Sequence, residues 1–254
     1  MTRTARKKSS SGIYHLVVRG INRQNIFEYP EDREKYLDSL KIVKGISGFK
    51  LYGYCLLDNH VHLLIGEEEE GLDIIFKRLG ARYVMWFNRK YERVGALFQG
   101  RYHSEAVEDD SYLLATLRYI HQNPVKAGLC ENPASYRWSS YSDYCGKGIG
   151  ITDTTLVLEQ FSSDITKQKS MFADFMIADD NNYTDYLDVD TNAPDALKRK
   201  MTLLCGVDTA TGFQALDPAK REEGVRMLRR AGLSIRQIVR LTGVSFGVVR
   251  KIGK

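Results

Sequence analysis

Cysteine is scarce in this sequence, and the few cysteines present form no recognisable pattern. The 254 residues include only Cys55, Cys130, Cys145 and Cys205. No two of them have CxxC or another short zinc-ligand spacing. A chain of this length needs no disulfide framework to hold a core together. The sequence therefore predicts a protein of the reducing cytoplasm, in which Cys55, within an apolar run, is an ordinary core residue.

Long apolar runs and internal repeats are also missing. No stretch approaches the roughly 18 apolar residues that span a bilayer, and the basic residues 1–8 lead into the polar residues 9–12 rather than into a signal sequence. What is present is the composition of a globular protein, with 43% hydrophobic and 27% charged residues. We expect a soluble principal domain with a small accessory domain and no contact with a membrane.

The net charge of +5 is modest, but it is unevenly distributed. Residues 218–254 carry ten Lys and Arg against two Asp and Glu, whereas residues 151–217 carry five against twelve. This asymmetry predicts an acidic connector between two modules that face nucleic acid.

The hydrophobic periodicity predicts the order β-α-β-β-α-β-α. The strands are expected at 13–19, 49–57, 60–65 and 102–107, and the helices at 31–44, from 72 and from 109. Asp58 and Asn59 are turn formers between the second and third strands. The order resembles a ferredoxin-like α+β fold, an antiparallel sheet with helices on one face.

Two histidines in the third predicted strand form the first candidate site. His60 and His62 are two residues apart, so in a strand both imidazoles project from the same face. This is the geometry of a metal-binding pair, although HxH pairs also occur by chance.

The second candidate site closes the last predicted helix of this fold. Tyr119 shares a helical face with Gln122 and Asn123, at i+3 and i+4. Pro124 disfavours helical geometry in the residue before it, so Asn123 is expected at a frayed or kinked end. Spacing alone leaves the choice between the two amides open.

Three ordered segments together resemble a known family. They are Val-Arg-Gly-Ile-Asn-Arg-Gln at 18–24, Asp-Asn-His-Val-His-Leu-Leu at 58–64 and Tyr-Ile-His-Gln-Asn-Pro-Val-Lys-Ala-Gly-Leu at 119–129. They resemble the single-tyrosine HUH transposases, specifically the REP-associated tyrosine transposase branch of the IS200-like superfamily. The resemblance covers about residues 13–145, including Trp-Ser-Ser-Tyr at 138–141, and departs from the family at Ile21, where a polar residue is expected.

The resemblance implies a metal-dependent strand transferase. It assigns a divalent ion, Mg²⁺ or Mn²⁺, to His60, His62 and Asn123, and the nucleophilic oxygen to Tyr119. Attack on single-stranded DNA would leave a 5′-phosphotyrosine and a free 3′-hydroxyl, so rejoining needs no nucleotide cofactor. The expected substrates are strands with hairpins, at transposon ends or repetitive extragenic palindromes.

Basic residues are the candidates for gripping DNA, with nearby Tyr and Phe able to stack unpaired bases. In the main domain they are Arg19, Arg23, Arg78, Arg82 and Arg101, together with a flexible basic arm over residues 1–12 that includes Arg3, Arg6, Lys7 and Lys8. Each arginine is about as well explained as an ordinary surface residue.

The basic C-terminus predicts a helix-turn-helix. Ser234 and Ser245 are expected to cap helices at 235–241 and 246–252, with a turn at Gly243. The inward set is Ile235, Ile238, Val239, Val244, Val248, Val249 and Ile252, and the outward set is Arg236, Arg240, Arg250 and Lys251. The segment resembles the helix-turn-helix end of the replication initiator DnaA, which implies binding to duplex DNA.

The predicted domains are thus the arm at 1–12, the HUH domain at 13–145, a partly helical connector at 146–217 and the DNA-binding domain at 218–254. Two other functions compete with the transposase hypothesis: a non-catalytic DNA-binding regulator built on an HUH fold, and a rolling-circle replication initiator. The protein is expected to act as a monomer or a homodimer.

Overall fold

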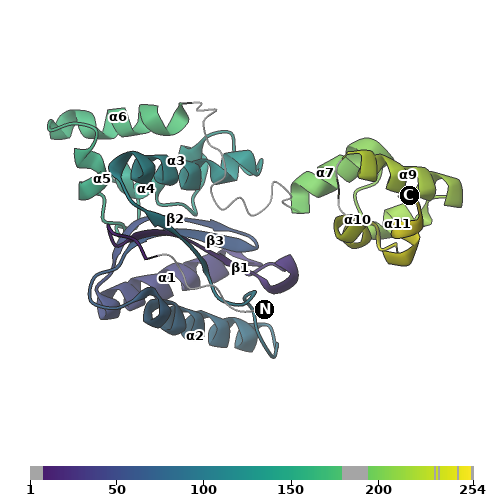
Figure 1. Ribbon diagram of the computed structural model, residues 1–254, viewed down its shortest axis with the longest axis horizontal. Coiled ribbons are helices and arrows are strands. Elements are labelled where there is room, and N and C mark those ends of the chain that lie inside the picture. Colours follow the sequence, from purple (N-terminus) through teal and green to yellow (C-terminus); the bar gives the residue numbers. More distant parts are fainter. Residues whose placement is uncertain (1–7, 179–193, 232, 234, 245, 253–254) are drawn as a thin grey trace. The chain divides into compact units, whose positions relative to one another are not determined.

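The computed structural model describes residues 8–178, 194–231, 233, 235–244 and 246–252. Residues 1–7 of the predicted arm, including Arg3, Arg6 and Lys7, and the predicted caps Ser234 and Ser245 lie outside them. The chain divides into two compact units, 1–187 and 188–254, which are described separately (Figure 1).

A four-stranded antiparallel sheet forms the centre of the first unit. Its strands are β1 (Ile13–Arg19), β2 (Lys50–Leu57), β3 (His60–Gly66) and β4 (His103–Val107), in the order β2-β3-β1-β4. As predicted, Asp58 and Asn59 form the turn of the β2-β3 hairpin. The α+β class and the ferredoxin-like element order are confirmed.

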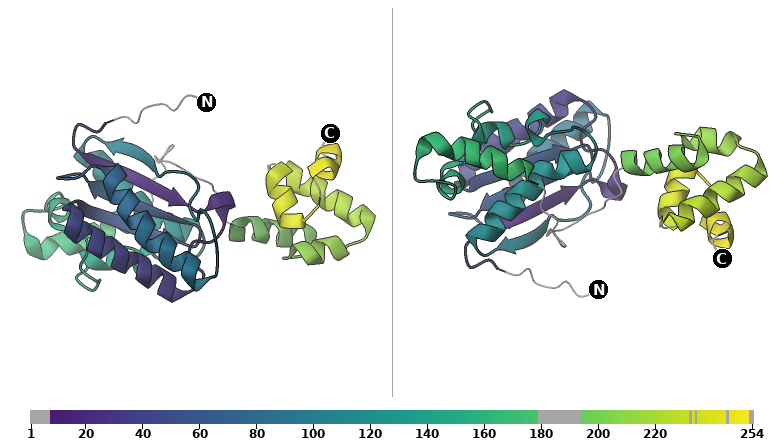
Figure 2. Two further views of the ribbon diagram at one scale, coloured as in Figure 1. Left: turned by 90° about the horizontal axis from the view of Figure 1, so that it is seen from below. Right: turned by 90° about the horizontal axis from the view of Figure 1, so that it is seen from above.

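Two long helices cover one face of this sheet, α1 (Pro30–Ser47) and α2 (Leu72–Lys90). They lie side by side in Figure 2. Pro30 occupies the first helical position of α1, and the Asp32 carboxylate accepts from the backbone N–H groups of Glu28 and Tyr29, at 2.7 and 2.9 Å. The helix ends at Gly48, with φ +70°, one turn beyond the predicted end near Gly45.

The opposite face is covered by α3 (Asp110–Lys126), which corrects the expectation that all helices lie on one face (Figure 1). Alternate residues of a strand point to opposite faces of the sheet, and both faces carry apolar side chains. Leu63, for example, points toward α1 and α2, and Leu64 points toward α3, so both faces must be buried. The helix begins at Asp109, whose side chain accepts from the backbone N–H of Tyr112 at 2.8 Å. It runs past Pro124, so residue 123 lies within its last turn and not at a kink before it.

Part of the predicted connector packs on α3. Three further helices, α4 (Tyr141–Tyr144), α5 (Thr155–Glu159) and α6 (Ile165–Ile177), complete the first unit, with the 3-10 turns η1 (Ile21–Arg23) and η2 (Pro133–Ser135). Phe172 of α6 stacks on Tyr144 at a centroid distance of 4.5 Å. Aromatic burial thus ties this segment to the first unit rather than leaving it as a linker.

Helices are the only regular secondary structure among the described residues of the second unit. It contains α7 (Pro194–Cys205), α8 (Ala210–Ala215), α9 (Pro218–Arg230), α10 (Ile235–Thr242) and α11 (Phe246–Ile252). Its core includes Phe213 of α8 and Met201 of α7. The unit therefore begins before the predicted boundary at 218, because these helices supply part of the apolar core that the two terminal helices need.

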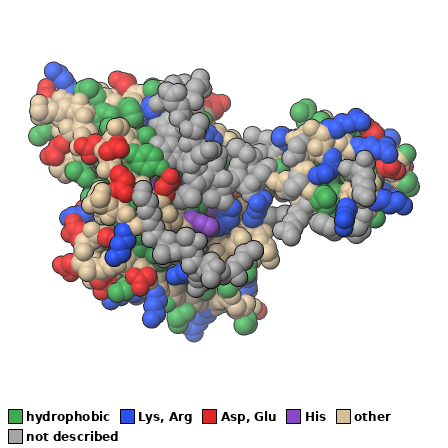
Figure 3. Space-filling view, in the orientation of Figure 1, with side chains coloured by type: hydrophobic (Ala, Val, Ile, Leu, Met, Phe, Trp, Pro, Cys, Tyr) green, Lys and Arg blue, Asp and Glu red, His purple; other side chains and the backbone are tan. Residues whose placement is uncertain are grey.

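The predicted inward set of the C-terminal helices is correct for the buried Ile238 and Val249 and wrong for Val248, which is 47% exposed. Arg250 and Lys251 are exposed, as predicted, and Lys and Arg side chains are prominent on the face of this unit in Figure 3. The side chains of Arg236 and Arg240 lie outside the described residues. Within the described part of the chain, no helix combines the length and apolar character that crossing a membrane requires.

Candidate active site

The site lies on the face of the sheet that α3 covers. In the antiparallel register of β1 and β3, Arg19 pairs with His60 and Val17 with His62. The side chains of two residues paired across neighbouring strands project from the same face of the sheet, and so do the side chains of residues i and i+2 within one strand. One side of two neighbouring strands therefore brings together His15, Arg19, His60 and His62.

His60 and His62 project together, as their spacing predicts. Their ring centroids are 4.9 Å apart and their planes are inclined by 76°. His60 Nδ1 lies 2.6 Å from Asn59 Oδ1, an acceptor, so the ring proton is on Nδ1 and Nε2 carries the lone pair. His62 Nδ1 lies 3.0 Å from Nε2 of His15, a residue that spacing alone does not single out.

Tyr119 and Asn123 of α3 reach the same place. The Tyr119 ring is 5% exposed, and its centroid lies 5.6 Å from that of His62 and 5.8 Å from that of His15. Asn123 Nδ2 lies 3.3 Å from His62 Nε2. The phenol and the two imidazoles thus converge, although 57 residues of chain or more separate them.

Gln122 points elsewhere. Its amide nitrogen donates to the backbone carbonyls of Met176 and Ala178, at 3.0 and 3.3 Å, at the end of α6. The structure therefore places Asn123 beside the histidines and Gln122 against α6, a choice that helical spacing leaves open.

The environment keeps both histidines neutral near pH 7. Burial, and then the charge of Arg19, lower the pKa of His60 to about 3. Burial also lowers the pKa of His62 well below its usual value, with further contributions from His60, His15 and Arg19. Neutral imidazoles offer a lone pair, so no proton has to leave before a cation binds.

These residues fit a divalent cation in their donor chemistry. Among the described residues, no three His, Cys, Asp or Glu side chains form a group that could hold a metal ion. The available set is instead two imidazole Nε2 atoms and one amide. The amide presents its nitrogen to His62, and a half-turn of the side chain brings Oδ1, the ligand atom, to the same place.

The predicted DNA-gripping arginines are dispersed. Arg19 lies on the histidine face, and Arg23 lies in η1 with φ +62°. Arg78 is held by Glu70 and by Ser47 Oγ, the latter at 2.8 Å, and is already engaged on the α1/α2 side. Arg82 is exposed on α2, which covers the other face of the sheet, and Arg101 is exposed in the segment before β4.

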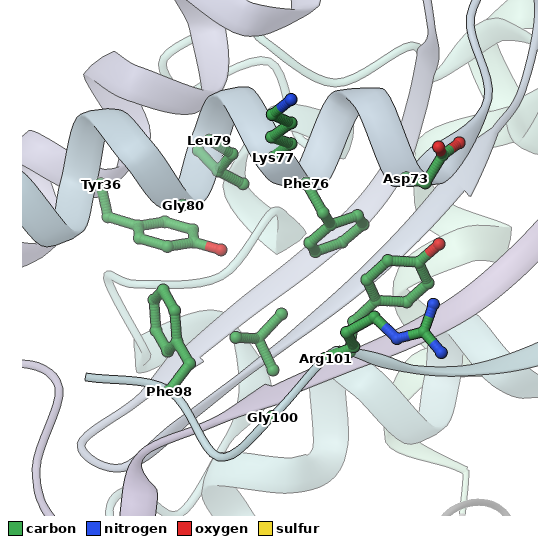
Figure 4. Close-up of a pocket in the computed structure, with 11 residues that line it drawn as sticks. Tyr36, Asp73, Phe76, Lys77, Leu79, Gly80, Phe98, Gly100 and Arg101 are labelled. Atoms are coloured by element: carbon green, nitrogen blue, oxygen red, sulfur yellow. The ribbon is translucent and has the colours of Figure 1, made fainter. Parts of the chain in front are cut away.

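Arg101 borders an apolar cavity of about 340 Å³ on the α1/α2 side of the sheet (Figure 4). Aromatic rings line it, among them Phe76 and Tyr102, which stack at a centroid distance of 4.2 Å. Figure 4 shows Lys77 and Asp73 on α2 beside it. The cavity is separate from the histidine site.

Sequence reasoning missed four residues near the histidines. Asn59 and His15 contact His60 and His62, Glu105 lies behind His15, and Lys126 Nζ lies 5.1 Å from the centroid of the Tyr119 ring. Lys126 is seven residues after Tyr119, which is a same-face spacing that was available as a signal. His15 and Glu105 depended on strand register, for which the sequence has no comparable signal.

Comparison with known proteins finds a similar family, a similar sequence and a similar fold. Residues 8–123 match the family model for IS200-like transposases. A curated REP-associated tyrosine transposase of Haemophilus influenzae is 28% identical over 104 residues, which cover 37% of this chain and 59% of that protein. The match thus spans less than two thirds of the relative's length.

A solved structure of a REP-associated tyrosine transposase bound to a REP hairpin has the same fold. The TM-score is 0.50 at 17% identity, covering 59% of this chain and 88% of the other. At that identity the likeness concerns the fold alone. Both relatives are REP-associated tyrosine transposases, the branch that the three sequence motifs predict.

Proposed function

We propose that the first unit cuts and rejoins single-stranded DNA beside hairpins, with Tyr119 as the nucleophile. The observation that carries the proposal is the convergence of Tyr119 and Asn123 with the paired imidazoles of His60 and His62. The relatives support the substrate class, since the solved neighbour is bound to a REP hairpin. The convergence itself supports chemistry on a phosphodiester rather than binding alone.

The metal would be held by His60, His62 and Asn123. Bound there, Mg²⁺ or Mn²⁺ would neutralise the charge of the scissile phosphodiester and align it with the attacking oxygen. The chain's own contribution is to hold the two lone pairs toward one point and to keep the phenol next to them.

Tyr119 Oη would attack the phosphorus and displace the 3′-oxygen. The phenol loses its proton, a phosphorus–oxygen bond to tyrosine forms, and the departing 3′-oxygen becomes a hydroxyl after it gains a proton. The downstream strand stays on the enzyme as a 5′-phosphotyrosine. A second 3′-hydroxyl can reverse the step, because the phosphodiester energy is conserved.

Two cations on the same side would contact the DNA backbone. Arg19 shares the strand face of the histidines, and Lys126 lies over the Tyr119 ring from the same helix. Phosphates on either side of the scissile bond are their expected partners. Arg78 is a weaker candidate than its sequence position implies, since Glu70 already neutralises it.

The aromatic cavity beside Arg101 would hold an unpaired base of the substrate. Stacked rings and a neighbouring cation are the elements that single-stranded nucleic-acid sites use. The terminal helices α10 and α11, with exposed Arg250 and Lys251, would add a contact to duplex DNA.

The test is formation of a covalent adduct. The full chain is incubated with Mn²⁺ and hairpin-bearing single strands labelled at the 3′ end, because the downstream fragment is the one that stays on tyrosine. A labelled band of protein size on a denaturing gel is expected. It should disappear with EDTA and return when Mn²⁺ is added again.

A label at the 5′ end of the DNA shows which chemical group ends the fragment that is released. With the 5′ end labelled, the shortened strand should be free and extendable by a polymerase, which requires a 3′-hydroxyl. Hairpin binding without any adduct, over a set of hairpins from the DNA around the gene, would contradict the proposal and favour a non-catalytic DNA-binding regulator.

A further inference from the structure

A third histidine, His15 of β1, is completely buried behind His62. Its neighbours along the strand, Tyr14 and Leu16, are buried apolar residues. A polar ring at such a position costs free energy unless it is hydrogen-bonded, whereas a leucine would fill the space without that cost. Packing alone therefore does not explain why a histidine occupies this position.

The contacts of His15 join the metal-binding histidine to two other elements. His15 Nε2 lies 3.0 Å from His62 Nδ1, and the two rings stack at a centroid distance of 5.3 Å. On the other side, His15 Nδ1 lies 4.0 Å from Glu105 Oε2 of β4. The Tyr112 hydroxyl, on the first turn of α3, donates to Glu105 Oε1 at 2.6 Å.

The positions of the protons follow from these contacts. A cation bound at His62 Nε2 needs the lone pair on that atom, and the Asn123 amide nitrogen that faces it in the metal-free structure, a donor, needs the same tautomer. The proton of the neutral His62 ring is then on Nδ1, where it is donated to His15 Nε2. His15 consequently carries its own proton on Nδ1, the atom that faces the carboxylate of Glu105.

We propose that His15 is a positioning residue for His62, with Glu105 behind it. Together, His15 and Glu105 hold the His62 ring in the tautomer and orientation that direct Nε2 toward the cation. A histidine ligand whose other ring nitrogen donates to a fixed acceptor is both oriented and made more basic. Because Tyr112 anchors Glu105 to α3, the same contacts couple the metal ligand to the helix that carries Tyr119. The inference rests on the proposed metal site.

The first measurement is Mn²⁺ affinity, by isothermal titration of the full chain without DNA. His15→Leu is expected to weaken binding about 10- to 100-fold, the usual range when such an outer partner is removed. His15→Gln should recover part of that loss, because an amide oxygen can accept the His62 proton. Glu105→Gln should give a smaller loss than His15→Leu.

The matched control is His121→Leu. His121 is equally buried in the same unit, but its Nε2 lies 2.8 Å from Ser140 Oγ and not near the metal ligands. Its loss should leave Mn²⁺ affinity within about twofold of the original. Circular dichroism identifies variants that do not fold, and if His15→Leu is one of them, His15→Gln and Glu105→Gln carry the test.

The second measurement is the tautomer of His62 in the metal-free protein, from the nitrogen chemical shifts of the imidazoles. The Nδ1–H form is expected in the original chain and a mixture of the two forms in His15→Leu. An unchanged tautomer together with an unchanged Mn²⁺ affinity would overturn the inference. Complete loss of binding in both His15→Leu and His15→Gln would overturn it as well, because it would make His15 a direct ligand.

The two proposals fail differently. If the original chain binds no Mn²⁺, the proposed metal-dependent function fails, whereas the tautomer measurement still reports whether His15 controls the His62 ring. If the original chain binds Mn²⁺ and forms the adduct but the His15 variants behave like it, only the role of His15 is lost.

Discussion

The two faces of the central sheet use the same strands for different purposes. Toward α1 and α2, the alternate residues are apolar, and their polar contacts are at the periphery, where Asp32 meets Lys90 and Tyr91. Toward α3, the other alternate residues include His15 and His62, buried and joined to each other. The period of two lets one strand present apolar side chains on one side and buried imidazoles on the other.

This difference implies that the two faces should respond differently to substitution. Changes on the α1/α2 face should alter the free energy of unfolding and leave the chemistry of the folded protein intact. Changes on the α3 face should alter the chemistry first. The four predictions below test this division, in order of decreasing effect.

The largest expected effect is that of Tyr119→Phe. Loss of the phenol oxygen removes the proposed nucleophile, so the covalent adduct should become undetectable while hairpin binding stays the same. The matched variant is Tyr83→Phe on the other face, where the hydroxyl donates to the Ile26 carbonyl at 2.5 Å. It should form the adduct normally and lose about 1 kcal/mol of stability. An adduct that survives Tyr119→Phe would point to another tyrosine, such as Tyr112.

The second prediction concerns pH. Burial lowers the pKa of His15, His60, His62 and His121 from the usual value of 6.5, to about 3 for His60 and His121. The unfolded chain then binds more protons than the folded one below pH 6.5, so stability is complete above that pH and falls as the pH decreases. At pH 5.5 the loss should be about 1.4 kcal/mol each for His60 and His121, or about 3 kcal/mol for the two, and the lowered pKa of His15 and of His62 adds to it in the same direction.

Urea denaturation of the metal-free protein at pH 7.5, 6.5 and 5.5 measures this slope. His103→Gln, at an exposed position of β4, is the control and should follow the same curve. A stability that stays constant between pH 7.5 and 5.5 would contradict the assignment of neutral, buried imidazoles.

The third prediction is for Asp32→Asn on the α1/α2 face. Burial favours the protonated carboxyl, but the bonds from Lys90, from the backbone and from Tyr91 outweigh it and hold the pKa of Asp32 below its usual value. Removing the charge should cost about 3 kcal/mol in urea denaturation at pH 7. Adduct formation by the folded protein should be unchanged.

The control for this variant is Asp38→Asn, whose exposed carboxylate pairs with Lys35 at 3.3 Å. A surface pair of this kind contributes less than about 1 kcal/mol. The adduct assay is run under conditions in which the Asp32→Asn variant is fully folded. If the variant then formed less adduct than the original chain, the proposed division between the two faces would be wrong.

The smallest effect is expected for Gly53→Ala, where α3 approaches β2. A Cβ atom there would lie 2.5 Å from Leu117 Cδ1, so the leucine must shift, at a cost of about 1 kcal/mol. Since Leu117 and Tyr119 share α3, adduct formation should also slow. Gly45→Ala, in α1 with open space around it, should instead raise stability by up to about 1 kcal/mol. If Gly53→Ala and Gly45→Ala changed the free energy of unfolding equally, the expected clash between a Cβ atom at residue 53 and Leu117 would be contradicted.

Much of the fold and of the candidate site could be predicted, because the decisive patterns are short. The side-chain period of two placed His60 and His62 on one face, and the helical period placed Asn123 one turn after Tyr119. The order of strands and helices indicated the ferredoxin-like topology. The boundary of the second unit was less predictable, because it depends on which helices share a core.

What the sequence by itself determined is therefore local: the element order, the shared face of the two histidines and the helical relation of the tyrosine to its two amides. Only the tertiary structure decided that α3 covers the second face, that Gln122 turns toward α6 and that His15 contacts His62. The physical reason is range. Backbone geometry dictates periodicities over a few residues, whereas contacts among β1, β3, β4 and α3 depend on strand register and packing between segments far apart in the chain.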